Sequence, residues 1–134
     1  MPELDPIART DEALRLAKQG IISSKEMLTR LAAGQLVVPV AELPRIEKSV
    51  ITGWRPASVS RADGSQWLVA FTNAEFAAAF SESEPTYPLQ MSVSTAWVVA
   101  MLPASWGIVL NLRTENMITW NAAGVAKFKQ DFLT

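Results

Sequence analysis

Two of the five tryptophans in this chain of 134 residues stand where binding side chains are often found. Trp54 and Trp106 fall in segments that we predict as loops, beside Gly53 and Gly107, whereas the other three fall in predicted strands or a helix. Trp and Arg carry much of the binding energy of protein interfaces, and Arg55 follows Trp54 directly. We therefore predict a protein-binding surface around Trp54, Arg55 and Trp106.

The region around Trp54 has two other interpretations. In the first, Trp54 covers one end of the core and the neighbouring arginines are solvated, as is usual for these residue types. In the second, Trp54 stacks on single-stranded nucleic acid, helped by the four basic side chains between residues 44 and 61. The chain has a net charge of −1, which gives no general attraction to nucleic acid or to anionic membranes. We expect neither of those partners.

Asn111 and Arg113 come at the end of a short apolar run, "WGIVLN", that we predict as a central strand. A polar Asn at the end of a buried strand can bond to a nearby turn, which is the structural interpretation. It can also lie at the rim of a pocket, where Asn111 and Arg113 would contact a ligand. Both residues are therefore candidates for binding, beside the tryptophans.

Catalytic chemistry finds little support in the residue types. The chain contains no His and no Cys, which excludes a Ser–His–Asp triad, a cysteine nucleophile and a thiolate zinc site. Paired carboxylates remain, but Glu82 and Glu84 lie in a predicted solvated loop, while Glu75 and Asp63 have local roles in a cap and a turn. The sequence has no glycine-rich phosphate loop. We predict a protein that is not an enzyme and uses no cofactor or metal.

Two helices are predicted to open the domain after a flexible arm of residues 1–9. Thr10 is expected to cap the first helix, and Gly20 to end it in the left-handed conformation. Ser23 and Glu26 fit a capping box at the start of the second helix. The short link between the two helices predicts a helical hairpin.

Strand signals follow the helices. The run "QLVVPV" predicts a strand in which Pro39 cannot donate to a ladder, so we expect an edge strand or a bulge. Residues 42–54 lack a clear period and are predicted as a loop. Residues 56–72 indicate a hairpin with its turn at Asp63 and Gly64.

The stretch "WLVAFTNAEFAAAF", residues 67–80, predicts a change from strand to helix. Thr72 is expected to be the N-cap, with Glu75 three residues later completing a capping box. Phe71 and Phe76 have the spacing of a hydrophobic staple across that cap. The stretch therefore needs no ligand to explain it.

The remaining third of the chain predicts strands between helices. "STAWVVAML" has the apolar spacing of a buried helix, and "MITW" is the expected hairpin partner of "WGIVLN". Asn121 should cap a last helix whose inner face holds Val125, Phe128 and Phe132. Helices interspersed with hairpins predict a single α+β domain over residues 10–134, built on a mixed, largely antiparallel sheet.

The chain resembles the N-terminal domain of the SseB family in the order of three segments. They are "QLVVPV", "GSQWLVAFTNAEFAAAF" and "WGIVLNLRTENMITWNAAGVAKF". The similarity spans residues 14–132. It includes a strand ending in Phe-Thr before a helix, and a Gly-hydrophobic-hydrophobic-Asn strand before the last helix. The chain departs from the family at Leu112, because the family often has Pro after the Asn. The resemblance implies a bacterial setting with links to secretion, and it brings no catalytic residue.

Together these features favour a non-catalytic domain that binds another bacterial protein, in a secretion or toxin–immunity system. The alternative is a small-molecule binding or sensing domain with a pocket lined by Trp97, Trp106 and Asn111. A homodimer formed through helices is a further alternative, since Pro39 protects the strand edge. The acidic start lacks the pattern of a signal peptide, and no apolar run reaches the length of a membrane span. We expect a soluble protein of the cytoplasm.

Overall fold

The computed structural model describes residues 6–43, 45–47, 50–52, 54–114 and 117–133, with the backbone alone for 6–9, 45–47 and 50–52. The helices are α1 (Pro6–Lys18), α2 (Ser24–Ala32), α3 (Ala74–Ser83), α4 (Thr95–Met101) and α5 (Ala122–Phe132). The strands are β1 (Gln35–Val40), β2 (Arg45–Glu47), β3 (Val50–Thr52), β4 (Ser58–Ser60), β5 (Gln66–Ala70), β6 (Leu89–Ser94), β7 (Gly107–Leu110) and β8 (Ile118–Trp120).

The largest sheet has four strands in the order β4–β5–β7–β8. The pairs β4–β5 and β7–β8 are antiparallel hairpins, as the sequence predicts. At the centre of the sheet β5 and β7 are parallel. The chain between them contains α3, β6 and α4, which is the long crossover that parallel neighbours require. The prediction of an α+β domain with a mixed, largely antiparallel sheet is confirmed.

A second ribbon joins β1 to β6 in antiparallel register along the full length of both strands. On its other side β1 is held by two isolated bridges, Val37 to Phe71 and Val40 to Pro56. Val37 exchanges two backbone hydrogen bonds of 2.8 Å with Phe71, so the nitrogen of Pro39, two residues later, faces the same side. The missing N–H of Pro39 therefore falls between the two bridges and leaves the ladder with β6 intact.

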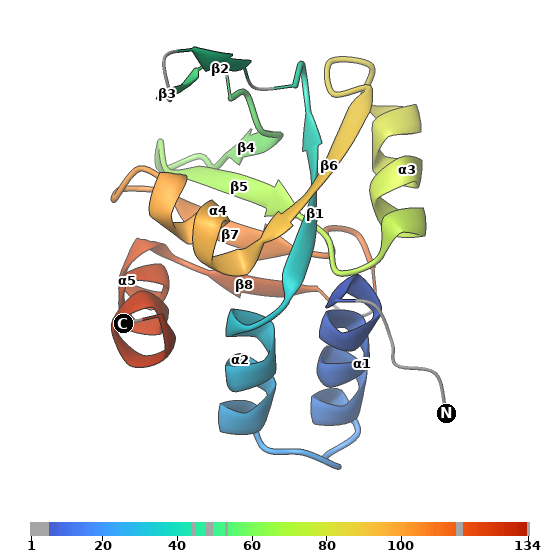
Figure 1. Ribbon diagram of the computed structural model, residues 1–134, viewed down its shortest axis with the longest axis vertical. Helices are drawn as coiled ribbons and strands as arrows, with labels where there is room; N and C mark the ends of the chain where they lie inside the picture. The colour runs from blue at the N-terminus through green and yellow to red at the C-terminus, as the bar shows by residue number, and fades with distance from the viewer. Residues whose placement is uncertain (1–5, 44, 48–49, 53, 115–116, 134) are drawn as a thin grey trace.

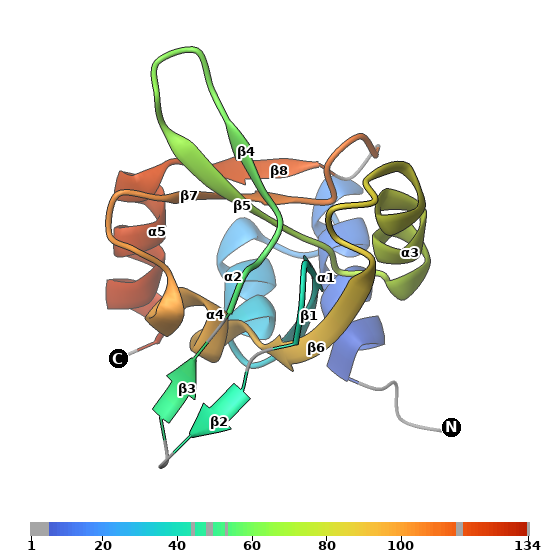
Figure 2. The same cartoon turned by 90° about the horizontal axis from the view of Figure 1, so that it is seen from above.

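The ribbon of β1 and β6 lies on one face of the four-stranded sheet and crosses its strand direction (Figures 1 and 2). α1 and α2 lie side by side below the strands in Figure 1, while α3 and α5 lie at opposite sides of the domain in both views. The main core contains fully buried apolar side chains from the ribbon, the sheet and α4, among them Leu36, Val38, Leu68, Val98 and Leu110.

α1 begins at Pro6, so the predicted cap at Thr10 is wrong. Proline is favoured in the first turn of a helix because its missing N–H would have no partner there. Thr10 is instead fully buried within α1 and lies against Gly34, whose lack of a side chain makes room for it. Of the predicted arm, residues 1–5 lie outside the described residues and 6–9 belong to α1.

Three other helix boundaries are confirmed. Gly20 follows α1 with a φ of 75°, a left-handed conformation that glycine adopts at little cost. Ser23 caps α2 by accepting a hydrogen bond from the backbone N–H of Glu26 at 3.1 Å. Asn121 caps α5 in the same way, with its Oδ1 accepting from Gly124 N–H at 2.8 Å. Each cap depends on contacts within three residues, which is why the sequence pattern predicts it.

The helix expected after β5 is present as α3, but its N-cap is Asn73, one residue later than predicted, so the prediction of Thr72 as the cap is wrong. The Oδ1 atom of Asn73 accepts hydrogen bonds from the N–H groups of Glu75 at 2.7 Å and Phe76 at 3.2 Å. Thr72 is fully buried, and its hydroxyl donates to Asp11 of α1 at 2.8 Å. A long-range contact thus removes Thr72 from the capping role that its type suggests.

The predicted staple between Phe71 and Phe76 is also wrong. Phe71 is buried, and its ring centroid lies 5.6 Å from that of Phe80, which in turn lies 6.3 Å from that of Tyr87. Phe76 is 36% exposed. The aromatic contacts belong to a second, smaller core beneath α3, formed by Val37, Ala57, Val69, Phe71, Ala77 and Phe80.

Three strands were not predicted. Residues 42–54, predicted as a loop, contain the antiparallel hairpin β2–β3. β6 was also missed, because the Ser- and Pro-rich residues before it indicated a longer loop. β2 and β3 have three residues each, and several residues of β6 are exposed. β2 and β3 are too short to show a period, whereas β6 (LQMSVS) alternates apolar and polar residues, a strand signal that was overlooked beside the predicted loop.

The predicted turn between β4 and β5 is confirmed. Gly64 has a φ of 87°, and the carboxylate of Asp63 accepts hydrogen bonds from Ser65, from its hydroxyl at 2.6 Å and from its N–H at 2.9 Å. These bonds, the hydroxyl bond first, hold the pKa of Asp63 below its usual value. Because folding lowers the pKa of Asp63, the ionised carboxylate stabilises the folded state. This stabilisation is present at neutral pH and is lost as the pH falls through the pKa of Asp63 in the folded state.

Replacing Ser65 by alanine is expected to raise the pKa of Asp63 toward its ordinary value of 3.8, because the hydroxyl donor is lost. The pKa can be measured by NMR titration of the carboxyl carbon. Ser60→Ala serves as control, since the Ser60 hydroxyl accepts a bond from Gln66 instead. An unchanged Asp63 pKa in Ser65→Ala would contradict the assigned cause.

Candidate functional site

An apolar groove brings together the two tryptophans that the sequence singles out. α4 ends at Met101, and a turn closed by a 3.0 Å bond from Trp106 N–H to the carbonyl of Pro103 leads into β7. Trp106 thereby lies near Trp54, which precedes β4. We call this site the tryptophan groove; its volume is about 370 Å³, and it is lined by Trp54, Pro56, Met101, Leu102, Pro103 and Trp106.

Trp54 is half-buried in this groove and was predicted at the surface. Its ring packs edge-to-face against Trp97, with ring centroids 4.9 Å apart. Its indole Nε1 is buried, and no acceptor for it is found among the residues that the structure describes. An unpaired buried donor costs roughly 1–3 kcal/mol. Trp54 is therefore held by apolar contacts, which pack it against the main core.

The basic residues near Trp54 do not form a patch with it, as far as their side chains are described. Arg55 is exposed and lies 3.4 Å from the carboxylate of Glu42, a surface pair of small energy. The guanidinium of Arg61 lies 4.1 Å from the ring centroid of Trp67. Arg55 thus stands beside the tryptophan groove without lining it. The other two basic side chains of residues 44–61 lie outside the described part.

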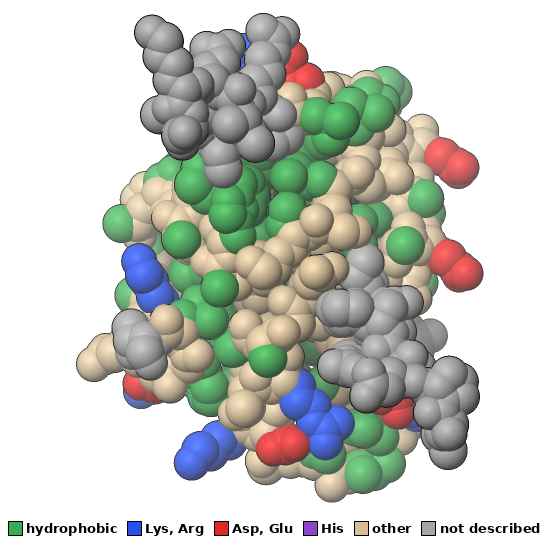
Figure 3. Space-filling model, in the orientation of Figure 1, with side chains coloured by type: hydrophobic (Ala, Val, Ile, Leu, Met, Phe, Trp, Pro, Cys, Tyr) green, Lys and Arg blue, Asp and Glu red, His purple; other side chains and the backbone are tan. Residues whose placement is uncertain are grey.

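The elements next to the tryptophan groove, β4 and α4, lie in an apolar region on one face of the molecule (Figure 3). Figure 3 shows hydrophobic side chains gathered in the upper half of that face, over β4 and α4, with most charged side chains below them and at the right-hand edge. Met101, in the lining, is 37% exposed. An apolar centre with charges around it is the usual composition of a protein-contact surface.

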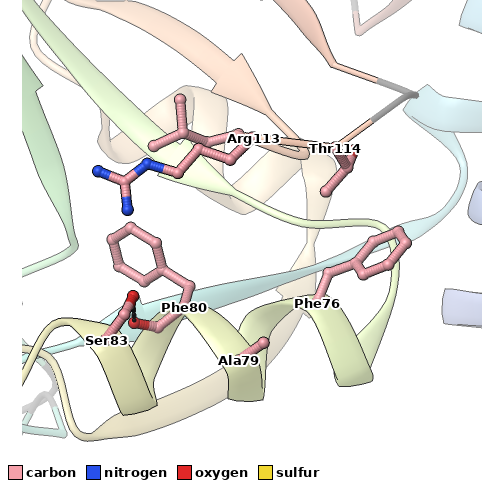
Figure 4. A pocket seen from close by; sticks show the side chains of 7 residues that line it. Phe76, Ala79, Phe80, Ser83, Arg113 and Thr114 are labelled. Carbon is pink, nitrogen blue, oxygen red and sulfur yellow. Dashed lines mark hydrogen bonds between the residues drawn. The ribbon is translucent and has the colours of Figure 1, made fainter.

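A second groove lies between α3 and the turn after β7. We call it the Arg113 groove; its volume is about 600 Å³, and it is lined by Phe76, Ala79, Phe80, Ser83, Leu112, Arg113 and Thr114. Figure 4 shows the guanidinium of Arg113 reaching over the ring of Phe80 toward Ser83, with Phe76 at the far end. The site thus combines an apolar floor with one cationic group.

The turn that carries Arg113 is closed by a 3.1 Å bond from the N–H of Thr114 to the carbonyl of Asn111. Arg113 is its third residue and has a φ of 65°. The residue at this turn position is normally Gly or Asn, because its φ is positive. For other residue types this conformation costs roughly 1–2 kcal/mol. Arg113 is exposed and lies 3.8 Å from Glu84, a pair that contributes about 1 kcal/mol at most.

Asn111 anchors this turn from below. It is fully buried and has a φ of 58°. Its Oδ1 accepts from the backbone N–H of Thr72 at 2.9 Å, and its Nδ2 donates to the Thr72 hydroxyl at 2.9 Å. That hydroxyl also bonds to Asp11. The interpretation of Asn111 as a partner of a nearby turn agrees with these bonds, whereas a place at a pocket rim does not agree with its complete burial.

The predicted pocket of Trp97, Trp106 and Asn111 does not form. Trp97 packs on Trp54, and Trp106 lies in the tryptophan groove at the start of β7. Asn111 lies just beyond the other end of that strand. Arg113, predicted at the rim of a pocket, lines the Arg113 groove, whereas the wall that α3 supplies was not predicted, because it comes from a part of the chain that is distant in sequence.

The acidic candidates are dispersed. Asp63 stands in the β4–β5 turn, Glu75 and Glu82 are exposed on α3, and Glu84 faces Arg113. In the described ranges no three acidic side chains converge as metal ligands would. Among the lining residues that the structure describes, neither groove has a pair of carboxylates.

Residues 11–127 match the family model of the SseB protein N-terminal domain. The chain belongs to the SseB family. The matched range includes both ends of β7 and the lining of both grooves of this SseB domain, and it confirms the resemblance seen in the sequence. Comparisons with curated proteins and with solved structures give no match. No described helix has the length and apolar character needed to cross a membrane.

Proposed function

We propose that this SseB-family domain is a non-catalytic module that binds another protein at the tryptophan groove. The observation that carries the proposal is the meeting of Trp54 and Trp106 in an apolar groove beside the exposed side chain of Met101. Tryptophan is enriched among the residues that dominate binding energy, and methionine adapts its shape to different partners. The absence of His and Cys from the chain supports a role without catalysis.

The expected partner is a bacterial protein with an aliphatic or aromatic side chain that enters the groove. An acidic group next to that side chain would meet Arg55, whose side chain is 73% exposed and only loosely paired. The family suggests a secretion or toxin–immunity system as the setting. A chain without cysteine suits the cytoplasm, where we place this interaction.

The experiment is affinity capture with the tagged domain from the bacterium that encodes it, followed by calorimetric titration of the recovered protein after purification. Met101→Glu is expected to weaken binding about thirtyfold, because a loss near 2 kcal/mol is typical of a central contact. Met101 is partly exposed, so this change should leave the core intact. Trp54→Phe keeps most of the apolar surface and should retain binding.

Phe76→Ala is the matched control, since it removes a partly exposed apolar side chain from the other groove. It should leave the affinity unchanged. The proposal fails if no protein is recovered, or if Met101→Glu and the unmodified domain bind the recovered protein equally well.

A further inference from the structure

The Arg113 groove contains an unfavourable backbone conformation that its visible contacts do not explain. Arg113 has a φ of 65° at a position where glycine would be comfortable. The ion pair with Glu84 is long, at 3.8 Å, and joins partly exposed side chains. It stabilises the fold by less free energy than the positive φ of Arg113 costs. A backbone conformation kept at such a cost indicates a role for the side chain outside the folded chain itself.

The residues around the guanidinium indicate which kind of ligand the Arg113 groove could bind. Phe80, which is nearly buried, lies beneath the guanidinium (Figure 4), Leu112 also lines the groove, and Phe76 is exposed enough to offer a ring face. The guanidinium reaches over this floor (Figure 4). Arginine binds carboxylates through two parallel hydrogen bonds, and an apolar floor favours a hydrocarbon body. The volume, about 600 Å³, lies in the range of small-ligand sites.

We propose that the Arg113 groove binds a small amphipathic carboxylate. The carboxylate pairs with Arg113, and an aromatic or aliphatic body lies on Phe76, Phe80 and Leu112. Without a ligand, the guanidinium pairs with Glu84. Glu84 therefore competes with an incoming carboxylate for Arg113. The groove and the α4–β7 connection lie at opposite sides of the domain (Figures 1 and 2), so this binding is independent of a protein on the tryptophan groove.

The test uses 3-phenylpropanoate as the probe and amide NMR shifts of the full chain as the readout. Saturation is expected in the millimolar range, which is ordinary for a ligand of this size, with shifts at residues 76–84 and 112–114. Arg113→Gly is expected to weaken binding roughly tenfold or more, because the charge-assisted bonds are lost. The same change relieves the positive φ, so the domain should stay as resistant to urea as the unmodified chain.

Three further variants separate the role of charge from general effects. Glu84→Gln is expected to tighten binding about twofold by removing the competitor, whereas Glu82→Gln should change nothing. Lys127→Ala removes an exposed cation on α5 and should leave the affinity as it is. Neutral 3-phenylpropanamide should bind much more weakly than the carboxylate, and acetate should not saturate.

Several results would overturn the proposal. A flat titration with 3-phenylpropanoate, equal binding of the carboxylate and the amide, or full affinity in Arg113→Gly would each exclude it. Shifts confined to the residues of the tryptophan groove would also exclude it, because the ligand would then bind elsewhere.

Discussion

Replacing Gly107 by alanine is expected to lower the free energy of unfolding by about 3 kcal/mol, the upper part of the usual range for overpacking. A Cβ at this position would lie 2.5 Å from the carbonyl oxygen of Trp120 and 2.6 Å from a ring carbon of Trp67. The backbone oxygen belongs to the neighbouring strand β8, and the indole is buried. Neither can move without disturbing the sheet, so the added methyl group must displace β7 itself.

Urea denaturation of the two proteins measures this difference. Gly124→Ala provides the matched control, because an added Cβ there has no heavy atom closer than 3.4 Å. Within α5 this change should be neutral or should stabilise the domain by roughly 0.5–1 kcal/mol. Equal stability of Gly107→Ala and the unmodified chain would show that β7 can shift, contrary to the close packing described above.

Asn111→Ala is expected to cost about 2–4 kcal/mol, which combines two effects. The buried N–H of Thr72 loses its acceptor, at roughly 1–3 kcal/mol. Alanine must also adopt the φ of 58° that Asn tolerates better, at roughly 1 kcal/mol. Asn111→Gly removes the second effect and keeps the first, so its stability should lie between those of Asn111→Ala and the unmodified chain.

A double-mutant cycle with Thr72→Ala tests whether the bonds between the two side chains add to this cost. Residues in one hydrogen-bond network couple by roughly 0.5–3 kcal/mol, and we expect a value within this range for Asn111 and Thr72. Asn121→Ala removes an exposed cap on α5 and should cost about 1 kcal/mol, additively with Thr72→Ala. Additive losses for Asn111 and Thr72 would contradict the network.

Gly107 begins β7, the strand that connects both grooves, and Asn111 directly follows its end. Trp106 precedes Gly107 and lines the tryptophan groove, while Arg113 follows Asn111 and lines the Arg113 groove. The packing at Gly107 and the bonds of Asn111 therefore set the positions of both binding residues. This arrangement gives a physical reason for a Gly-hydrophobic-Asn strand in the domain, apart from any ligand.

Local signals in the sequence were sufficient for much of the fold. The caps at Ser23 and Asn121, the turn at Asp63 and the hairpin of β7 and β8 depend on residues close in the chain. The α+β class followed from the order of these elements. The resemblance to the SseB family also followed from ordered segments of sequence, and the family match confirms it.

Other features of the fold depend on contacts between residues that are distant in sequence, and local sequence patterns did not predict them. Thr72 has the type of a cap but bonds to Asp11 and Asn111, which are distant in sequence. The parallel pairing of β5 and β7 depends on where the crossover places β7. The β2–β3 hairpin is too short to show a period.

The candidate sites divide in the same way. The sequence by itself determined which residue types are available for binding, and it excluded catalysis by His or Cys. Only the tertiary structure decided that Trp106 joins Trp54, that Asn111 is buried, and that Arg113 faces α3. A groove forms where side chains from separate elements meet, and these meetings depend on the packing of the whole chain.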